Sequence, residues 1–259
     1  MHNHERTPDS GTQRRIQLGH VCELVRYPVK SMAGTATESA FLGWHGLDGD
    51  RRFAFRRMGD DGGFPWLTAS RLPGLLLYHP LGLDERTGEP LPTHVRTPAG
   101  THVELRSAEL QSEIAERFGS SVELMQLKHG VFDEAPVSVI SLATIAGIGR
   151  EAGVDLDRRR FRANIVLETR DHETFLEDGW VGGTLVFGDS EPGPAVRVTL
   201  RDLRCMMVNL DPDTGTQEAR VMKTIVRMNK NTAGVYGTVV QTGTIRVGEP
   251  VSLVLDGRR

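Results

Sequence analysis

Most hydrophobic residues of this chain lie in short runs rich in β-branched and aliphatic side chains, separated by Gly, Pro and Asp. In the first half the runs cover residues 21–29, 36–42, 51–57, 95–105 and 121–127. Short runs bounded by turn residues are typical of β-strands, and the run at 95–105 contains a Pro98-Ala99-Gly100 turn. The first half is therefore predicted to be rich in strands.

Two segments carry helical signals instead. Residues 107–119 and residues 141–153 each open on a serine, a common N-cap residue, and each close on a glycine. In the first segment Leu110, Ile114 and Phe118 repeat at helical spacing. We expect one helix in each segment.

The second half returns to strand-like runs, which cover residues 163–168, 183–188, 195–210, 234–240 and 243–255. The last two runs meet at Gln241-Thr242-Gly243, which predicts a β-hairpin. Strands dominate, and a few helices pack against them. The predicted fold class is mainly β with a few helices (α+β), built of β-barrel units rather than an alternating βαβ sheet.

Composition is that of an ordinary soluble protein. Among 259 residues, 31 basic and 34 acidic side chains give a net charge of −3. This charge gives no electrostatic reason to expect a nucleic acid or an anionic membrane as partner, so any basic site must be local. The length allows one large core or two small ones, and two domains are a reasonable expectation.

The cysteine count and the first residues bear on location. Two cysteines are too few for a disulfide framework, and the first ten residues lack the apolar stretch of a secretory signal. No stretch approaches the roughly 18 to 20 consecutive apolar residues of a membrane span. A cytoplasmic protein without an integral membrane segment is expected. Residues 1–17 are mostly polar and are predicted to form a disordered tail.

The motifs of several common enzyme classes are absent from the sequence. It has no G-x-x-x-x-G-K-[ST], H-E-x-x-H, C-x-x-C or G-x-S-x-G pattern. Outside the first residues, no histidines pair at metal-ligand spacing, which argues against zinc hydrolase chemistry.

One of the two cysteines lies in a distinctive place. Cys205 follows Arg204 in an apolar run and precedes an Asp-Pro-Asp-Thr-Gly turn at 211–215. Free cysteines are often buried, so Cys205 is interpreted either as a small core residue or as a thiolate favoured by the adjacent guanidinium. A thiolate would be a soft metal ligand or a nucleophile. Successive strand residues point to opposite faces, so the local sequence leaves both interpretations open.

Three basic residues, Lys30, Arg51 and Arg162, lie where a loop meets a strand. Charged runs usually form a solvated surface, and that interpretation applies to each of the three. Loop–strand junctions are also places where a rigid framework holds binding residues. Three such junctions in a chain of negative net charge fit one compact anion, most simply a phosphate.

The order of the motifs is more specific than any single motif. Along the chain follow YPVKS, GLDGDRRF, PVSVIS, RRFRANIVL, FLEDGW, RCMMVNLDPDTG, GVYG and GTIRVGEPVSL. From Leu18 to Leu255 this succession resembles the MOSC family, named after the C-terminal part of molybdenum-cofactor sulfurase, with its usual N-terminal β-barrel companion. The subgroup that it resembles includes the mitochondrial amidoxime-reducing component.

The resemblance implies an N-terminal β-barrel-like domain at residues 18–110 and a MOSC domain at residues 111–257. It also implies a molybdenum cofactor, the molybdenum complex of molybdopterin. In the amidoxime-reducing subgroup the cysteine of an R-C motif gives its thiolate to the metal, which makes Cys205 the expected metal ligand and catalytic residue. The family's cofactor contacts fall on Lys30, Ser31, Arg51, Arg162, Asn164 and Tyr236.

Two serines precede the second predicted helix. For Ser138 and Ser141 the default role is to cap that helix, and the alternative is to bind the cofactor phosphate at its N-terminus. Because the phosphate-binding role remains open, Ser138 is included among the candidate cofactor contacts. The chain departs from the family's R-F-R-P-N stretch by having Ala163 in place of Pro, which keeps the polar side chains on either side.

The resemblance implies an oxidoreductase that reduces N-hydroxylated small molecules with electrons from a separate iron–sulfur, flavin or haem protein. A second hypothesis is a non-catalytic carrier that holds sulfur as a Cys205 persulfide, or the cofactor on its thiolate. A third is a β-barrel binding module whose thiol is merely packed. A nucleic acid partner is not expected.

Overall fold

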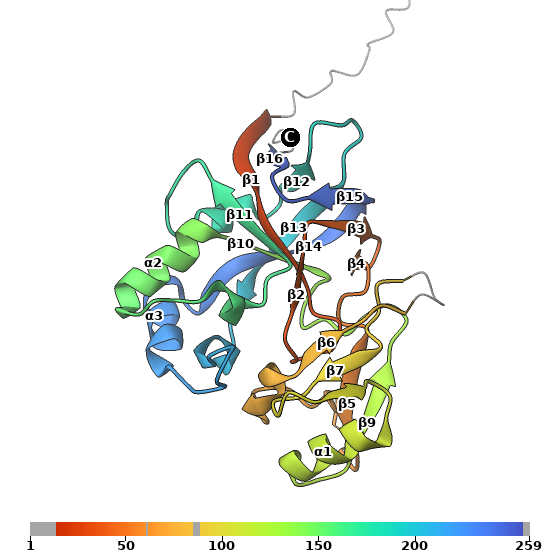
Figure 1. The fold of residues 1–259 in the computed structure, drawn as a ribbon. Helices are drawn as coiled ribbons and strands as arrows, with labels where there is room; N and C mark the ends of the chain where they lie inside the picture. The colour runs from red at the N-terminus through yellow and green to blue at the C-terminus, as the bar shows by residue number, and fades with distance from the viewer. Residues whose placement is uncertain (1–13, 61, 85–88, 256–259) are drawn as a thin grey trace, which may run out of the picture.

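A closed barrel of seven strands forms one of two lobes in the computed structural model, which describes residues 14–60, 62–84 and 89–255 (Figure 1). The hydrogen-bonded strand order is β11-β10-β14-β13-β12-β16-β1, and β1 also pairs with β11, which closes the ring. The barrel strands are β1 (Arg14–Arg26), β10 (Val137–Ser141), β11 (Ile165–Thr169), β12 (Thr184–Phe187), β13 (Ala195–Leu203), β14 (Thr232–Gln241) and β16 (Pro250–Leu255). The short strand β2 (Thr35–Thr37) continues the sheet beside β1.

Strand β1 joins distant parts of the sequence, because it pairs with β16 along one edge and with β11 along the other. Both pairings shift register near Gly19 and Val21. A Cβ atom on Gly19 would lie 2.0 Å from the carbonyl oxygen of Glu168, so only glycine fits where the two strands come closest. The first strand of the chain is thus an integral part of a barrel built mainly from the second half.

Aliphatic side chains that alternate along the strands fill the barrel interior. Because successive strand residues point to opposite faces, the inward set forms one continuous core. Its fully buried members include Val21, Leu24, Val137, Ile165, Leu167, Leu185, Val196, Val235, Val251 and Leu253.

Two helices cover one flank of the barrel. Figure 1 shows α2 (Leu142–Ala152) and α3 (Ala219–Asn229) side by side there, and the two helices pack against each other. The 3₁₀ turns η2 (Arg158–Phe161) and η4 (Met206–Asn209) lie against the same layer, and η3 (Leu176–Trp180) contacts β14. A separate apolar cluster, which includes Ile148, Phe161 and Ile225, holds this layer to the barrel.

The second lobe is built of shorter strands and has a hydrophobic core of its own. It contains β5 (Phe53–Arg57), η1 (Pro73–Leu77), β6 (His79–Leu81), β7 (His94–Arg96), β8 (His102–Glu104), α1 (Ala108–Phe118) and β9 (Val122–Gln126). Strands β5 and β9 form one sheet, and β6, β7 and β8 form another. Phe53, Phe55, Tyr78, Leu110 and Ile114 are buried between them. Between the lobes lies a third small sheet of β15 (Gly243–Arg246), β3 (Ser39–Gly43) and β4 (Gly46–Leu47).

The predicted fold class is confirmed, since strands dominate and a closed barrel is present. Both predicted helices exist as α1 and α2, with Ser107 and Ser141 accepting the N-cap hydrogen bonds and a left-handed glycine after each helix. No helix in the described ranges has the length and apolar character to cross a bilayer. The boundary between residues 110 and 111 stays a prediction.

Two expectations about local structure are wrong. The runs at 234–240 and 243–255 do not form a hairpin, because β14 already has β13 and β10 on its two edges and β15 pairs with β3 instead. The predicted tail of residues 1–17 falls partly on residues 1–13, which lie outside the described residues. The remaining residues 14–17 belong to β1.

Replacing Leu24 by Ala tests the barrel core. Leu24 is fully buried on the strand that closes the barrel. Its truncation is expected to lower the free energy of unfolding by about 2–5 kcal/mol in urea titrations, because the surrounding strands cannot collapse into the space. The same change at Leu83, which is exposed, is expected to cost less than about 0.5 kcal/mol. Equal effects of the two changes would contradict the described packing.

Candidate functional site

Cys205 lies at the point where β13 leaves the barrel. The strand ends at Leu203, and the residue after Cys205 begins the η4 turn. Arg204 points inward and is buried, whereas Cys205 is exposed. The two side chains therefore point to opposite faces, as extended backbone requires, and the interpretation of Cys205 as a packed core residue is excluded.

The exposed thiol faces a cavity of about 500 Å³ between the two lobes. The cavity is also lined by five of the residues that the sequence marked as cofactor contacts, which come from four separate places in the chain. These residues are Lys30, Ser31, Arg51, Arg162 and Tyr236. The structure thus brings the thiol and the three basic residues to one place.

Three of these residues have an unusual backbone. Ser31, Arg51 and Arg162 have φ angles of 69°, 48° and 51°, in the left-handed region that residues with a side chain rarely adopt. Neighbouring backbone holds two of them there: the Arg51 N–H donates to the Tyr27 carbonyl (2.8 Å) and the Arg162 N–H to the Arg159 carbonyl (3.2 Å). Such strain concentrates at ligand sites, because it aims side chains in directions that ordinary backbone does not reach.

Lys30 and Arg51 each have an acidic partner. The Lys30 ammonium lies 2.7 Å from an Asp133 carboxylate oxygen, and Arg51 forms an ion pair with the buried Asp50. Arg51 also donates to the Arg162 carbonyl at 3.1 Å. Burial lowers the pKa of Lys30, whereas the pKa of Arg51 is raised because Asp50 outweighs the opposing effect of burial. Both positive charges are partly neutralised before any ligand arrives.

Arg162 differs from the other two. Its guanidinium makes no hydrogen bond and no ion pair with any residue in the described parts of the chain. It stacks instead on the ring of Tyr27, with 4.2 Å between the guanidinium carbon and the ring centroid. Burial lowers its pKa to about 10, which still leaves it positive at neutral pH. A partly buried cation that lines a cavity, and whose donors pair with no group among the described residues, fits an anionic ligand.

Asn164 and Ser138 lie behind the cavity wall and are not among the residues that line it. Asn164 donates to the Val25 carbonyl (3.2 Å), and its amide oxygen accepts from Arg51 (3.3 Å) and from the Ser138 N–H (3.2 Å). Ser138 Oγ donates to the Asp202 carboxylate at 3.2 Å. In this structure both residues support side chains that reach the cavity, and their direct contact with a cofactor stays a prediction.

The N-terminus of α2 is already occupied by a carboxylate of the chain. Ser141 Oγ accepts from the Thr144 N–H (3.1 Å) and donates to Glu177 (2.9 Å), which is fully buried and also accepts from Thr144 Oγ1 (2.8 Å). The sequence left two roles open for Ser141, capping the helix or binding a phosphate. In the structure Ser141 caps the helix. Glu177 thus places its carboxyl group at this helix end, and burial raises the pKa of that carboxyl.

Sequence reasoning missed several residues of the cavity wall. Asp133 neutralises Lys30, Arg160 lines the cavity, and Asp202 lies beside Arg204 at 2.8 Å. Burial raises the pKa of Asp202 to about 6 and also raises the pKa of Tyr236. Asp202 lies only three residues before Cys205, and this closeness could have marked it as a site residue. The alternating strand pattern, however, does not show which polar residues point inward.

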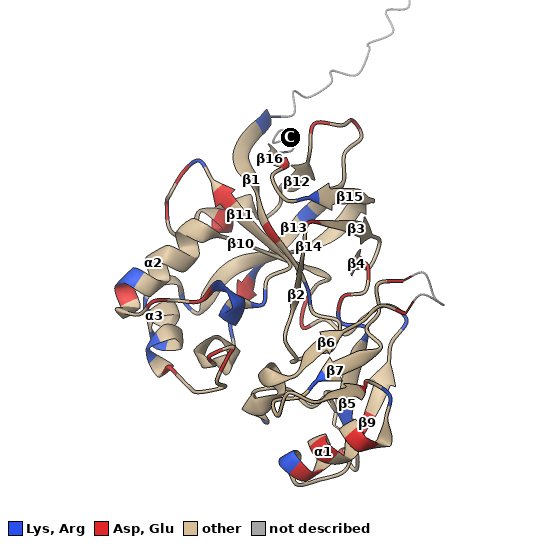
Figure 2. Ribbon diagram, viewed as in Figure 1, with Lys and Arg blue, Asp and Glu red and all other residues tan. Residues whose placement is uncertain are grey.

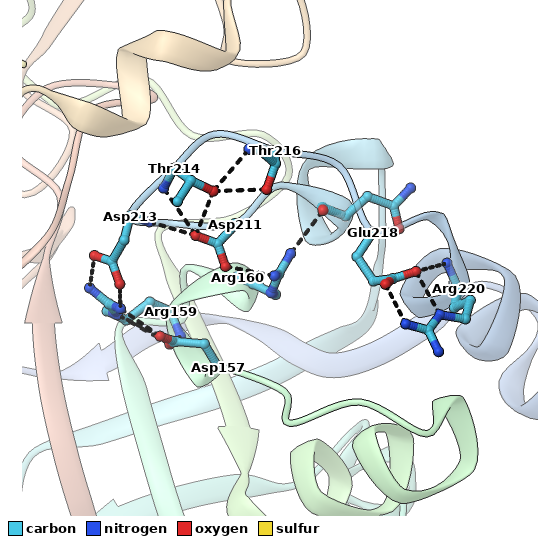
Figure 3. A network of polar contacts seen from close by, with 10 residues as sticks. Asp157, Arg159, Arg160, Asp211, Asp213, Thr214, Thr216, Glu218 and Arg220 are labelled. Atoms are coloured by element: carbon cyan, nitrogen blue, oxygen red, sulfur yellow. Dashed lines mark hydrogen bonds and ion pairs between the residues drawn. The ribbon is translucent and has the colours of Figure 1, made fainter.

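The turn at 211–215 holds the arginine-rich segment in place (Figure 3). Asp211 accepts from the N–H groups of Asp213 (3.1 Å) and Thr214 (3.0 Å), and its other oxygen binds Arg160 at 2.9 Å. Asp213 binds Arg159 at 2.6 Å. The turn chemistry expected from this motif is confirmed, and the turn anchors η2. Arg160 on η2 and Arg162 directly after it both line the cavity.

Comparison with known proteins places the chain in a family. The family model of the MOSC N-terminal beta barrel domain matches residues 18–127, and that of the MOSC domain matches residues 126–252. The chain therefore belongs to the MOSC family, which is associated with molybdenum-cofactor binding.

The curated relatives are amidoxime-reducing components at low identity. Mitochondrial amidoxime-reducing component 1 of Homo sapiens is 27% identical over 135 residues, which cover 47% of this chain and 38% of the human protein. Mitochondrial amidoxime reducing component 2 of Bos taurus is 24% identical over an alignment that covers 93% of this chain and 85% of the bovine protein. The match to the human protein thus spans about two fifths of its length.

A solved structure shares the fold along the whole chain. The YUAD protein of Bacillus subtilis superimposes with a TM-score of 0.51 at 13% identity, covering 94% of this chain and 99% of the other. At that identity the likeness concerns the fold alone.

The raised pKa of Asp202 predicts a pH-dependent stability difference between the protein and Asp202→Asn. The folded protein keeps the proton on Asp202 to higher pH than the unfolded chain does. Ionisation therefore costs folding free energy as pH rises, and the Asn variant escapes this cost. Between about pH 4.5 and 7, the unfolding free energy of the wild type should fall by about 2 kcal/mol relative to the variant.

Urea titrations at several pH values measure this difference, and Asp189→Asn is the control, because Asp189 is exposed. The control difference should stay constant over the same pH range. A constant difference for Asp202→Asn as well would show that the carboxyl ionises as freely in the folded protein as in the unfolded chain.

Proposed function

We propose that this chain holds a molybdenum cofactor in the cavity between its lobes and reduces N-hydroxylated small molecules with electrons from a separate redox protein. The observation that carries the proposal is that one cavity is lined by the exposed Cys205 thiol and by the Arg162 guanidinium, which has no polar partner among the described residues. The family and its amidoxime-reducing relatives support it. We also propose a cytoplasmic location.

The residues present fit the cofactor. Arg162 offers free donors to an anionic group such as a phosphate, and Lys30 and Arg51 add positive charge from the same wall. The Tyr236 phenol lines the cavity and can donate a hydrogen bond to the bound group. Cys205 supplies a sulfur ligand of the kind that suits a metal already bound by sulfur. When bound there, the cofactor supplies the two-electron chemistry that removes oxygen from nitrogen.

The proposed reaction takes an N-hydroxylated compound, two electrons and two protons to the N–H compound and water. The N–O bond breaks, the nitrogen is reduced, and a partner protein of the iron–sulfur, flavin or haem type is oxidised. Asp202 lines the cavity and, with its raised pKa, can hold a proton close to the reacting group. The wall thus provides a carboxyl group as well as cations.

A carrier function is the second candidate, and the exposure of Cys205 favours it specifically. An accessible thiol beside positive charge can hold a persulfide or the cofactor without turnover. Intact-protein mass spectrometry separates the two functions, since a persulfide adds about 32 Da that reduction removes. Turnover of an N-hydroxylated compound with an artificial electron donor would exclude transport as the sole role.

Replacing Cys205 by Ser tests the metal ligand directly. Protein made in a host that synthesises the cofactor is expected to contain close to one molybdenum per chain and to reduce benzamidoxime with reduced methyl viologen. Cys205→Ser should lower this activity by at least about a hundredfold, because a neutral hydroxyl is a poor ligand for a soft metal site. Metal analysis and product chromatography are the two measurements.

The other cysteine provides the control. Cys22 is partly exposed on β1 and does not line the cavity, so Cys22→Ser should keep both metal content and activity. Wild-type protein without molybdenum would refute the proposed function, and so would a Cys205→Ser variant with full activity.

Replacing Arg162 by Ala tests the anion site. Loss of a charge-assisted hydrogen bond costs about 1.5–3 kcal/mol, so the variant should retain roughly ten to a hundred times less cofactor after prolonged dialysis. Arg158→Ala is the matched control, because Arg158 lies in the same arginine-rich segment, pairs with Glu23 and does not line the cavity. Fluorescence of the oxidised pterin measures retention. Equal retention by the two variants would assign Arg162 a structural role only.

A further inference from the structure

Helix α3 concentrates positive charge that the cavity does not use. Residues 219–230 contain Arg220, Lys223, Arg227 and Lys230 and no acidic residue, in a chain whose net charge is −3. All four side chains are exposed. Figure 2 shows basic positions on α3 at the flank of the barrel. This is the local basic surface that the overall composition does not reveal.

Two of the four charges are neutralised and two are free. Arg220 pairs with Glu218 (2.6 Å) and Arg227 with Glu151 (2.7 Å). The side-chain ammonium groups of Lys223 and Lys230 make no hydrogen bond or ion pair within the described ranges. Residues three apart share a helix face, so Val226, which is half exposed, lies beside Lys223, and Lys230 follows four residues later as the cap that ends the helix. The result is an exposed stripe with an apolar centre and two free positive ends.

The stripe lies next to the segment that carries Cys205. Helix α3 packs on η4, which begins directly after Cys205, and the Met222 N–H donates to Asn209 Oδ1 at 2.9 Å. Just beyond the helix, Asn231 bonds to Arg204 in both directions: its carbonyl accepts from the Arg204 N–H (2.9 Å) and its amide donates to the Arg204 carbonyl (2.9 Å). Lys230 is therefore the sequence neighbour of a residue that is hydrogen-bonded to Arg204, which precedes the thiol.

An exposed apolar residue connects the stripe with the cavity. Leu203 is 61% exposed, lies opposite Thr232 in the β13–β14 pairing and also lines the cavity. A partner that covers Val226 and Leu203 would reach the cavity rim. Such a partner would meet positive charge at Lys223 and Lys230.

We propose that the α3 face, defined as Leu203, Lys223, Val226 and Lys230, is the docking surface for an electron-carrier protein with an acidic contact surface. The inference rests on the proposed function, since a reductive reaction needs such a donor. Complementary charge speeds the encounter and orients the partner, and a small interface suits an electron donor that must leave after each transfer. The α3 face combines both properties beside the segment that bears Cys205.

Charge reversal of the two free lysines tests the docking surface. With reduced acidic [2Fe–2S] ferredoxin as donor at low ionic strength, Lys223→Glu/Lys230→Glu should raise the KM for ferredoxin by roughly tenfold or more. With reduced methyl viologen, a small molecule, the same variant should match the wild type. The difference between variant and wild type should shrink in about 0.5 M NaCl, because salt screens exposed charges.

The matched control is Arg14→Glu/Lys128→Glu, which makes the same change in net charge. Arg14 begins β1 and Lys128 follows β9, and both are exposed. Figure 1 shows the start of β1 and the strand β9 away from α3. The control should keep the wild-type KM for ferredoxin. Equal impairment of the two double variants, or no impairment of the α3 variant, would overturn the assignment.

Carbodiimide cross-linking gives a result that does not depend on turnover. It joins ferredoxin carboxylates to lysine amines in contact, and peptide mass spectrometry should find Lys223 or Lys230 in the products. Cross-links confined to other lysines would overturn the docking surface. Absence of methyl viologen turnover in the wild type would refute the reductase function instead, and the cross-links would still decide the docking surface.

Discussion

The buried guanidinium of Arg204 holds the site together. It donates to the Ala233 carbonyl at the start of β14 (2.7 Å) and to the Phe161 carbonyl at the end of η2 (2.7 Å), and it pairs with Asp202 on β13 (2.8 Å). Three segments that are far apart in sequence therefore meet at one side chain. Because Arg204 faces inward on extended backbone, Cys205 must face outward into the cavity. Loss of Arg204 would leave two carbonyl groups without this donor and the buried Asp202 with only the hydrogen bond from Ser138.

Positive charge and backbone strain meet at the same wall. Arg51 and Arg162 both have left-handed backbones and both stack on the ring of Tyr27. Among the residues that the structure describes, Arg51 has an acidic partner and Arg162 has none. Folding has to bear the cost of burying like charges close together and of holding strained backbone. A bound anion would relieve part of the electrostatic cost, so the wall is better suited to a ligand-bound state than to an empty one.

The sequence predicted the parts of the fold that depend on local chemistry. Alternating runs, the Ser107 and Ser141 caps and the Asp211–Gly215 turn are local signals, and the structure contains each of them. Helix α3 gave no such signal, because Glu218 rather than Ser or Thr caps it. The hairpin after β14 was wrong because strand partners depend on which sheet edges are free, and local sequence does not show that.

Charge and position pointed to three basic residues as an anion site, and the order of motifs supplied the rest of the candidate site. Lys30, Arg51 and Arg162 were marked as binding residues, but only the fold shows that they line one cavity with Cys205. That Asn164 and Ser138 lie behind the wall follows from side-chain direction, which a motif does not encode. Asp133 and Asp202 escaped notice because their roles arise from contacts with Lys30 and Arg204 across long separations in the chain.

The place of β1 in the barrel has a consequence for the order of folding. This strand is synthesised early, yet its partners β11 and β16 follow more than a hundred and more than two hundred residues later. Contacts between such distant residues form slowly, because a long loop must close before they stabilise anything. Until those partners are synthesised, both edges of β1 remain unpaired, and unpaired strand edges are prone to aggregation. The seven-strand barrel can therefore close only once β16 is available to pair with β1.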